Sequence, residues 1–109
     1  VDAYVADPLC GFVSSASYFY YFFKGIKDAF RQENIRQIKT SIPVYCFAGD
    51  RDPVGGCGKG VIKLVENWRA AGASNIRYDL YKDGRHEMMN DINREEVLNN
   101  ILLFINQNK

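Results

Sequence analysis

Apolar residues recur at steps of three and four in the first third of the chain, which is the period of an α-helix. They lie between Ser17 and about Ile35, and they are Phe19, Phe22, Phe23, Ile26 and Phe30. Ser17 is placed to cap this predicted helix, because a serine hydroxyl accepts a hydrogen bond from a free backbone amide. Such an aromatic helix is typically buried against a larger body, and the alternative is the wall of an apolar pocket. The preceding segment, Val1 to Gly11, ends with proline and glycine and is expected to be irregular.

Two later segments have the patterns of β-strands. Residues 44–48 form an uninterrupted apolar run between Pro43 and Gly49. This run predicts a strand that is buried on both faces, as in a parallel sheet. In residues 76–82, apolar Ile76, Tyr78 and Leu80 alternate with more polar neighbours. The alternation predicts a second strand with one wetter face, near the edge of the sheet.

Helical patterns follow each of these strands. Between Lys59 and Ala71 the apolar residues share one helical face, and Gly72 is placed to end the helix. A last helix is predicted for residues 94–107, with Asn93 as its cap and Glu96 completing a capping box. Helices that alternate with strands are typical of an α/β protein with a parallel sheet.

An acid and the single histidine of the chain follow the two predicted strands. Parallel strands joined by a crossover helix end at the same edge of the sheet, where ligands of α/β proteins bind. Asp52 follows the first strand and His86 follows the second, so their side chains can meet. Taken singly, an Asp before Pro commonly starts a turn, and a histidine in a loop is commonly solvated surface.

Composition narrows the function classes. The chain has 14 Lys and Arg against 13 Asp and Glu, so a nucleic-acid partner is not expected. No run approaches the roughly 20 apolar residues of a membrane span. Three cysteines without metal-ligand spacing indicate free thiols and a cytoplasmic setting. The start at Val1 lacks the features of a signal peptide, and the natural start is expected elsewhere.

Three segments of the chain match the motifs of a known family: residues 7–12 (DPLCGF), residues 43–55 (PVYCFAGDRDPVG) and residues 81–91 (YKDGRHEMMND). With them, nearly the whole chain resembles the α/β-hydrolases related to monoacylglycerol lipases and lysophospholipases, including the serine-aminopeptidase-like group. The resemblance implies that Asp52, the second aspartate of Gly-x-x-Asp-Pro-Val, is the acid of a catalytic triad. It likewise implies that His86, in Arg-His-Glu, is the base. Asp50 does not match the family's acid.

The resemblance also implies a fold. Residues 1–109 would be the C-terminal half of an α/β-hydrolase domain, with a parallel sheet, crossover helices and part of a cap. The cap-like helical region would be residues 1–40, and residues 41–109 would be the strand, helix, strand and helix that carry the acid and histidine loops.

The nucleophile of such an enzyme is not in this sequence. Serines occur only at positions 14, 15, 17, 41 and 74, and none lies in a Gly-x-Ser-x-Gly elbow. The expected function is hydrolysis of carboxylic esters with a lipophilic acyl group, without a cofactor or metal. The chain would need the N-terminal half of the hydrolase, or a second copy, as its partner. Alone it is expected to be inactive, because the oxyanion hole is missing too.

Three other interpretations remain open. A nucleotide-binding module could use the glycines from Gly55 to Gly60, although their spacing fits neither a dinucleotide fingerprint nor a phosphate loop. Cys57 could be a nucleophile paired with His86, although a free cysteine is more often a packing residue. The segment could also be a non-catalytic interaction scaffold, although intact acid and histidine loops argue against it.

Overall fold

The computed structural model describes residues 2–109, and Val1 lies outside them. These residues form, in order, α1 (Asp2–Ala6), α2 (Ala16–Ala29), α3 (Gln32–Ile35), β1 (Val44–Gly49), α4 (Lys59–Ala70), β2 (Ile76–Tyr81) and α5 (Arg94–Gln107). The strand, helix, strand and helix predicted after residue 41 are confirmed. Gly72 ends α4 as predicted, with a φ of +102° that few other residues adopt.

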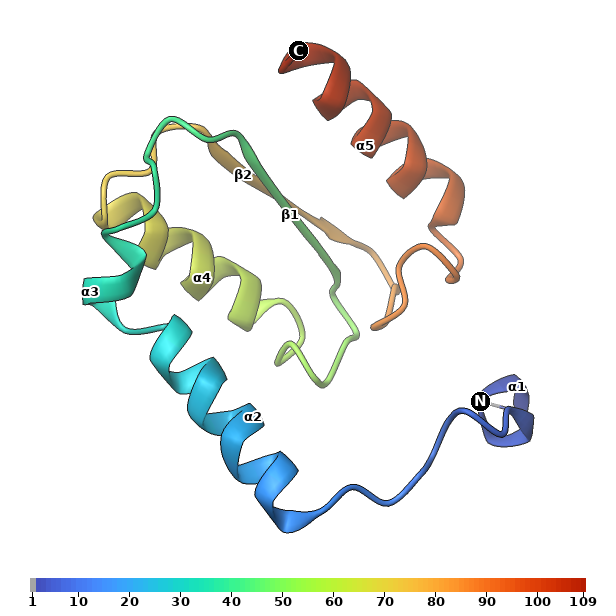
Figure 1. The fold of residues 1–109 in the computed structure, drawn as a ribbon. Helices are drawn as coiled ribbons and strands as arrows, with labels where there is room; N and C mark the ends of the chain where they lie inside the picture. Colours follow the sequence, from blue (N-terminus) through green and yellow to red (C-terminus); the bar gives the residue numbers. More distant parts are fainter. Residues whose placement is uncertain (1) are drawn as a thin grey trace.

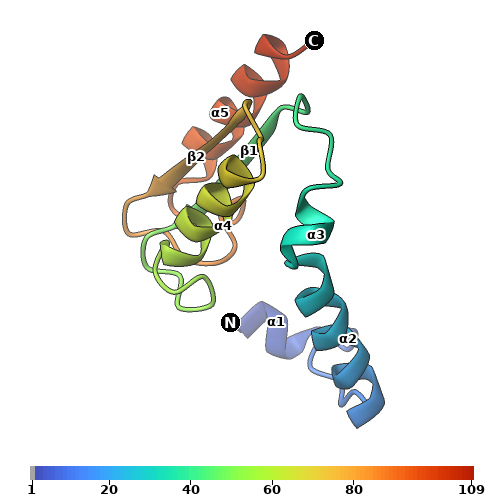
Figure 2. The same cartoon turned by 90° about the vertical axis from the view of Figure 1, so that its left-hand side faces the viewer.

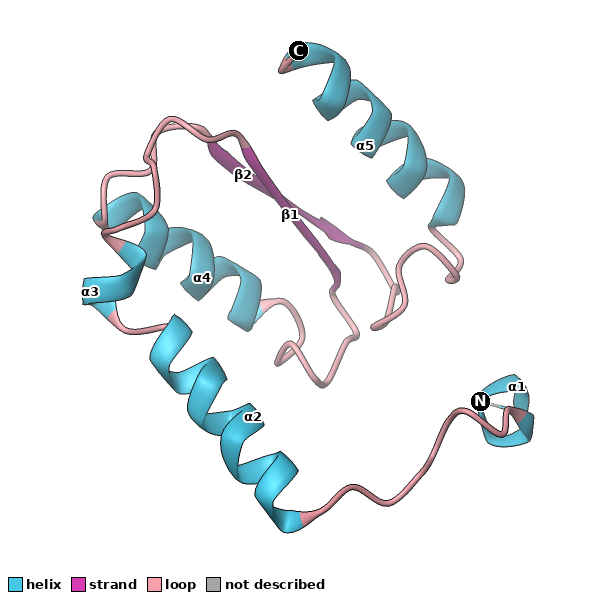
Figure 3. Ribbon diagram, in the orientation of Figure 1, coloured by secondary structure: helices cyan, strands magenta, loops and turns pink. Residues whose placement is uncertain are grey.

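The two strands pair in parallel and in register. Val44 lies opposite Ile76, and Gly49 lies opposite Tyr81, so both strands end at the same level. α4 connects them on one side of the sheet, and α5 lies on the other side (Figures 1 and 3). The loops that follow β1 and β2 therefore leave the same edge of the sheet.

The core between the sheet and α5 consists of Tyr81, Met88 and Val97, against which Phe47 and Ile101 pack. β1 is less buried than predicted. Its residues 44–47 are only half-buried, and Ala48 and Gly49 are buried. The prediction of a strand buried on both faces is wrong for the described chain, because β2, α4 and α5 cover only part of β1.

The amino-terminal region departs from prediction in three ways. Asp2–Ala6 form α1 where irregular structure was expected. The helix predicted for residues 17–35 is two helices, because Arg31 is extended between them (φ −67°, ψ 138°). Ser15 rather than Ser17 caps α2, since its hydroxyl accepts the Tyr18 N–H at 3.2 Å.

The aromatic helix α2 stands apart from the sheet (Figure 2), and none of its residues is buried. The exposed side chains include six consecutive aromatic residues, Tyr18, Phe19, Tyr20, Tyr21, Phe22 and Phe23. Because a helix turns about 100° per residue, six consecutive side chains surround it. Burial of this helix against a larger body, the prediction from sequence, is not met by the described residues.

The cap predicted for α5 is also wrong. Asn93 precedes α5 but makes no side-chain cap, so the capping box with Glu96 does not form. The side chain of Asn93 turns instead toward the loop after β2, where its amide donates to the Lys82 carbonyl at 3.3 Å. No helix between residues 2 and 109 combines the length and apolar character that a membrane crossing requires.

Candidate active site

Asp52 lies in the tight loop that follows β1, and only 4% of its surface is exposed. Its carboxylate accepts two backbone amides of that loop, from Val54 at 2.9 Å and from Gly55 at 3.2 Å. Its own carbonyl accepts the Cys57 N–H at 2.7 Å. Asp52 thus makes the turn that an Asp before Pro commonly makes, and the turn holds its carboxylate in one orientation.

His86 lies in the loop that follows β2, and its Nδ1 is 3.0 Å from Oδ2 of Asp52. The two residues are 34 positions apart in sequence, and the parallel register of the strands brings them together. The hydrogen bond with His86, aided by the amides of Val54 and Gly55, holds the pKa of Asp52 below its ordinary value. The same hydrogen bond and the charge of Asp52 raise the pKa of His86. An ionised carboxylate therefore faces the ring nitrogen, which places the ring proton on Nδ1.

The two loops are joined by hydrogen bonds beside this pair. The Arg51 N–H donates to the Gly84 carbonyl at 2.9 Å, and the Asp83 N–H donates to Oδ1 of Asp50 at 2.8 Å. Gly49 has no room for a side chain, because a Cβ there would overlap the peptide between Gly84 and Arg85. The end of β1 and the loop that carries His86 can approach this closely only with glycine at position 49.

Most amides of the glycine-rich loop between Asp52 and α4 are already paired. The Gly56 N–H donates to Pro53, the Lys59 N–H to Gly56, and the Gly60 N–H to Gly55. The amides of Val54 and Gly55 point at the Asp52 carboxylate, and that of Cys57 at its carbonyl. A phosphate loop needs free amides that converge on an anion, so this geometry argues against the nucleotide-binding interpretation.

Cys57 is exposed and adopts a left-handed conformation (φ +54°) in the same loop. Its N–H serves the Asp52 carbonyl, and in the described chain its thiol makes no hydrogen bond with His86. The ring nitrogen that the structure shows in use, Nδ1, is bound to Asp52 rather than to sulfur. Within residues 2–109, no group of three or more His, Cys, Asp or Glu is placed to hold a metal ion.

Comparison of the chain with known protein families gives a match. The family model for serine aminopeptidase, S33, matches residues 1–93. The chain belongs to the S33 serine aminopeptidase family of α/β-hydrolases. The predicted membership and the α/β-hydrolase fold are thereby confirmed.

One solved relative of this S33-family chain is a highly thermostable carboxyl esterase from Bacillus coagulans, determined in complex with glycerol. The two are 33% identical with a TM-score of 0.85. The match covers 94% of this chain and 34% of the esterase, so the chain spans about a third of that protein's length. Comparison with curated proteins gave no match.

The structure brings together both site residues predicted for this S33-family chain, and it adds four that sequence reasoning missed. Gly49 and Gly84 allow the close approach of the two loops, and Asp50 accepts an amide of the histidine loop. Asp91 accepts the Arg85 N–H, directly before His86. The glycine that ends β1 and the glycine in the loop after β2 were visible signals for the first two. The carboxylates carried no such signal, because their partners are backbone amides that only the folded loops define.

Proposed function

We propose that this chain carries the acid and the base of a serine hydrolase whose nucleophile lies in sequence that precedes residue 1. The observation that carries the proposal is the contact between Nδ1 of His86 and the buried carboxylate of Asp52, at 3.0 Å. In the described chain the other ring nitrogen, Nε2, makes no hydrogen bond, and the side chain of His86 is 61% exposed. A base needs this arrangement, with one nitrogen oriented and the other accessible.

In the assembled enzyme, Nε2 of His86 would take the proton of the serine hydroxyl as its oxygen attacks the acyl carbon. The tetrahedral oxyanion would then collapse, and the C–O bond to the leaving alcohol would break. The alcohol would leave with the proton from Nε2. Water would release the acyl group from the serine through the same steps. Asp52 would hold the ring and stabilise the imidazolium throughout.

The substrate class we propose is carboxylic esters with a lipophilic acyl group, of the lysophospholipase and monoacylglycerol lipase kind. The similarity to a carboxyl esterase supports the ester bond. The exposed aromatic side chains of α2 support the lipophilic group, since a cap made of such residues would give the acyl chain an apolar surface.

The proposal is tested by assaying the full-length protein that contains this segment with p-nitrophenyl esters of increasing acyl length. Asp52→Asn should lower kcat by about four orders of magnitude, because the imidazole takes the wrong tautomer. His86→Ala should be at least as severe.

Asp50→Asn is the matched control, because its amide oxygen can still accept the Asp83 N–H. Its effect on kcat should be far smaller. A larger loss from Asp50→Asn than from Asp52→Asn would show that the wrong acid is assigned. Wild-type protein without saturable ester hydrolysis would refute the proposed function.

A further inference from the structure

The loop that carries His86 has no helix or strand of its own between the end of β2 at Tyr81 and the start of α5 at Arg94. The position of His86 therefore depends on individual contacts. Met88 anchors the middle of the loop, because it is buried against Tyr81 and Val97. A second set of contacts surrounds the peptide unit between Gly84 and Arg85, one residue before His86.

This peptide unit, between Gly84 and Arg85, is held at both of its polar atoms. Its carbonyl accepts the Arg51 N–H from the acid loop at 2.9 Å. Its N–H donates to Oδ2 of Asp91 at 2.6 Å. Gly49 packs directly on the same peptide, with no space for a Cβ between them. The peptide is thus fixed from the acid loop on one side and by Asp91 on the other.

Asp91 is itself fixed at both oxygens. Oδ1 accepts the Ile92 N–H at 2.8 Å while Oδ2 binds the Arg85 amide. Its carbonyl accepts the N–H of Arg94, the first residue of α5, at 3.0 Å. The amides of Ile92 and Arg85 lower the pKa of Asp91, so it is ionised at neutral pH, where hydrogen bonds to a carboxylate are strongest.

We propose that Asp91 is a positioning residue for His86, because it ties the Gly84–Arg85 peptide, one residue before His86, to the start of α5. This inference deepens the proposed function and rests on it. Asp91 is half-buried, and no contact with His86 itself is among its hydrogen bonds. It acts through the backbone, by setting where the imidazole lies relative to Asp52.

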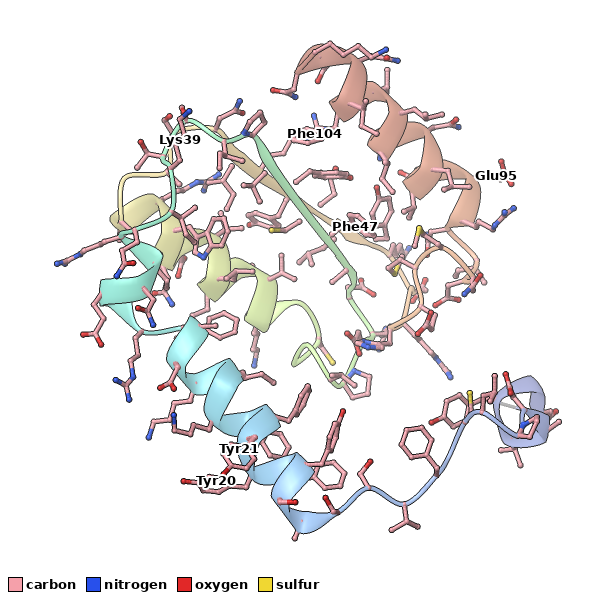
Figure 4. All side chains as sticks on the ribbon, in the orientation of Figure 1. Tyr20, Tyr21, Lys39, Phe47, Glu95 and Phe104 are labelled. Carbon is pink, nitrogen blue, oxygen red and sulfur yellow. The ribbon has the colours of Figure 1, made fainter. Side chains whose placement is uncertain are left out.

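The test compares Asp91→Ala and Asp91→Asn with Glu95→Gln in the full-length protein. Asp91→Ala removes both hydrogen bonds, and Asp91→Asn keeps one acceptor oxygen. Glu95→Gln is the matched control, because it also removes one negative charge near the start of α5 (Figure 4), from a side chain that is 85% exposed. Each variant is measured for kcat and KM on a p-nitrophenyl ester. Each is also measured for the pKa of His86 by NMR titration of the imidazole.

We expect kcat to fall about 10- to 100-fold in Asp91→Ala, as for other small misplacements of catalytic groups. The change in KM should stay within about two-fold, and the pKa of His86 should move toward its ordinary value. Asp91→Asn should recover part of the kcat and part of the shift in the pKa of His86, and Glu95→Gln should match the wild type in both. A purely structural Asp91 would lower the melting temperature and leave kcat and the pKa of His86 unchanged, which would overturn the proposal.

The two arms separate this inference from the proposed function. If the wild type hydrolyses no ester, the proposed function fails, and the titration of His86 still decides whether Asp91 sets its environment. If Asp91→Ala does not fold, Asp91→Asn gives the answer by the same two measurements. An unshifted His86 pKa in a folded Asp91→Asn with wild-type kcat would refute the role of Asp91.

Discussion

The carboxylate of Asp52 binds through both oxygens before any substrate arrives. Oδ1 accepts the Val54 amide, and Oδ2 accepts the Gly55 amide and faces Nδ1 of His86. Three donors around one buried carboxylate fix its rotamer and keep it ionised. The turn that Asp52 forms within its own loop is therefore what aims it at a histidine from another loop.

The raised pKa of His86 predicts where activity begins on the pH scale. The base must be neutral, and Asp52 favours the protonated ring, so the proton leaves at a higher pH than from a free histidine. We expect the acid limb of kcat/KM to have its midpoint above 6.5, the ordinary pKa of histidine. NMR titration of His86 in Asp52→Asn should return the midpoint toward 6.5. A midpoint that does not move would contradict this cause.

The pKa shifts of His86 and Asp52 also determine how the stability of the fold changes with pH. Raising the pKa of His86 stabilises the fold below 6.5, and this contribution disappears as pH rises through the folded value. Lowering the pKa of Asp52 stabilises the fold above 3.8, and this contribution disappears as pH falls. The free energies of unfolding of wild type and Asp52→Asn, measured at several pH values, should thus differ most between about pH 3.8 and 6.5.

Asp52 and His86 could be predicted from sequence because two strong regularities coincide on them. Parallel strands end at one edge, and the acid and histidine motifs follow those strands. Asp91 had no such regularity, because its role depends on which amide its carboxylate meets once the loop has closed. Asp52 and His86, which act through side-chain chemistry, could be found from the sequence, whereas the backbone amides that Asp91 binds could not.

At the scale of elements, the approach of the histidine loop to the end of β1 depends on glycine. Gly49 is the last residue of β1, and Gly84 lies in the loop after β2. A Cβ at Gly84 would crowd the side chains of Asn93 and Met88. The sheet can thus bring the acid loop against the histidine loop at the distance between two backbones. Any side chain at position 49 would separate them.

We expect Gly49→Ala to destabilise the protein by about 1–3 kcal/mol, the usual cost of inserting a methyl group into a packed site. It should also abolish the shift in the pKa of His86. Gly25→Ala is the control, because nothing lies within 4 Å of the added Cβ and alanine favours the helix. Chemical denaturation and NMR titration measure both effects. A Gly49→Ala variant as stable as Gly25→Ala would contradict the close approach.

The sheet and its two covering helices were predictable because their apolar periods are long and end in clear stop signals, such as Gly72 after α4. The caps were not. Ser15 precedes α2 and Ser17 lies in its first turn, and which hydroxyl meets a free amide depends on where the helix begins. Asn93 has the right residue type for a cap, but the contact of its side chain with Lys82 replaced the capping interaction.

At the scale of the whole molecule, the chain is open. Its radius of gyration is 16.2 Å, against about 13 Å for a compact domain of this size. Among the residues that the structure describes, the largest fully buried side chains are only those of Val65 and Val97. Most of the large apolar side chains of α2 face solvent. These surfaces are expected to be covered by the preceding part of the hydrolase, or by a second copy.

We expect the purified 109-residue polypeptide to self-associate, to bind a hydrophobic dye and to hydrolyse no short-chain ester above the buffer rate. The exposed aromatic helix and the unpaired strand edges cause the first two, and the absent serine causes the third. Light scattering after size exclusion measures association. Replacing Phe22 and Phe23 with serine should reduce dye binding. A monodisperse monomer that unfolds cooperatively without binding dye would show that the segment is self-sufficient.

The in-register pairing of β1 and β2 has a consequence for which length changes the chain can accept. Asp52 and His86 each follow their strand by a fixed number of residues. Each residue added to a strand would shift the following loop by about 3.3 Å. A hydrogen bond does not survive that shift. Single insertions or deletions between residues 44 and 52, or between 76 and 86, should therefore separate the pair. The turn between α4 and β2 lies outside both spans, so we expect changes of length there to keep the pair in contact.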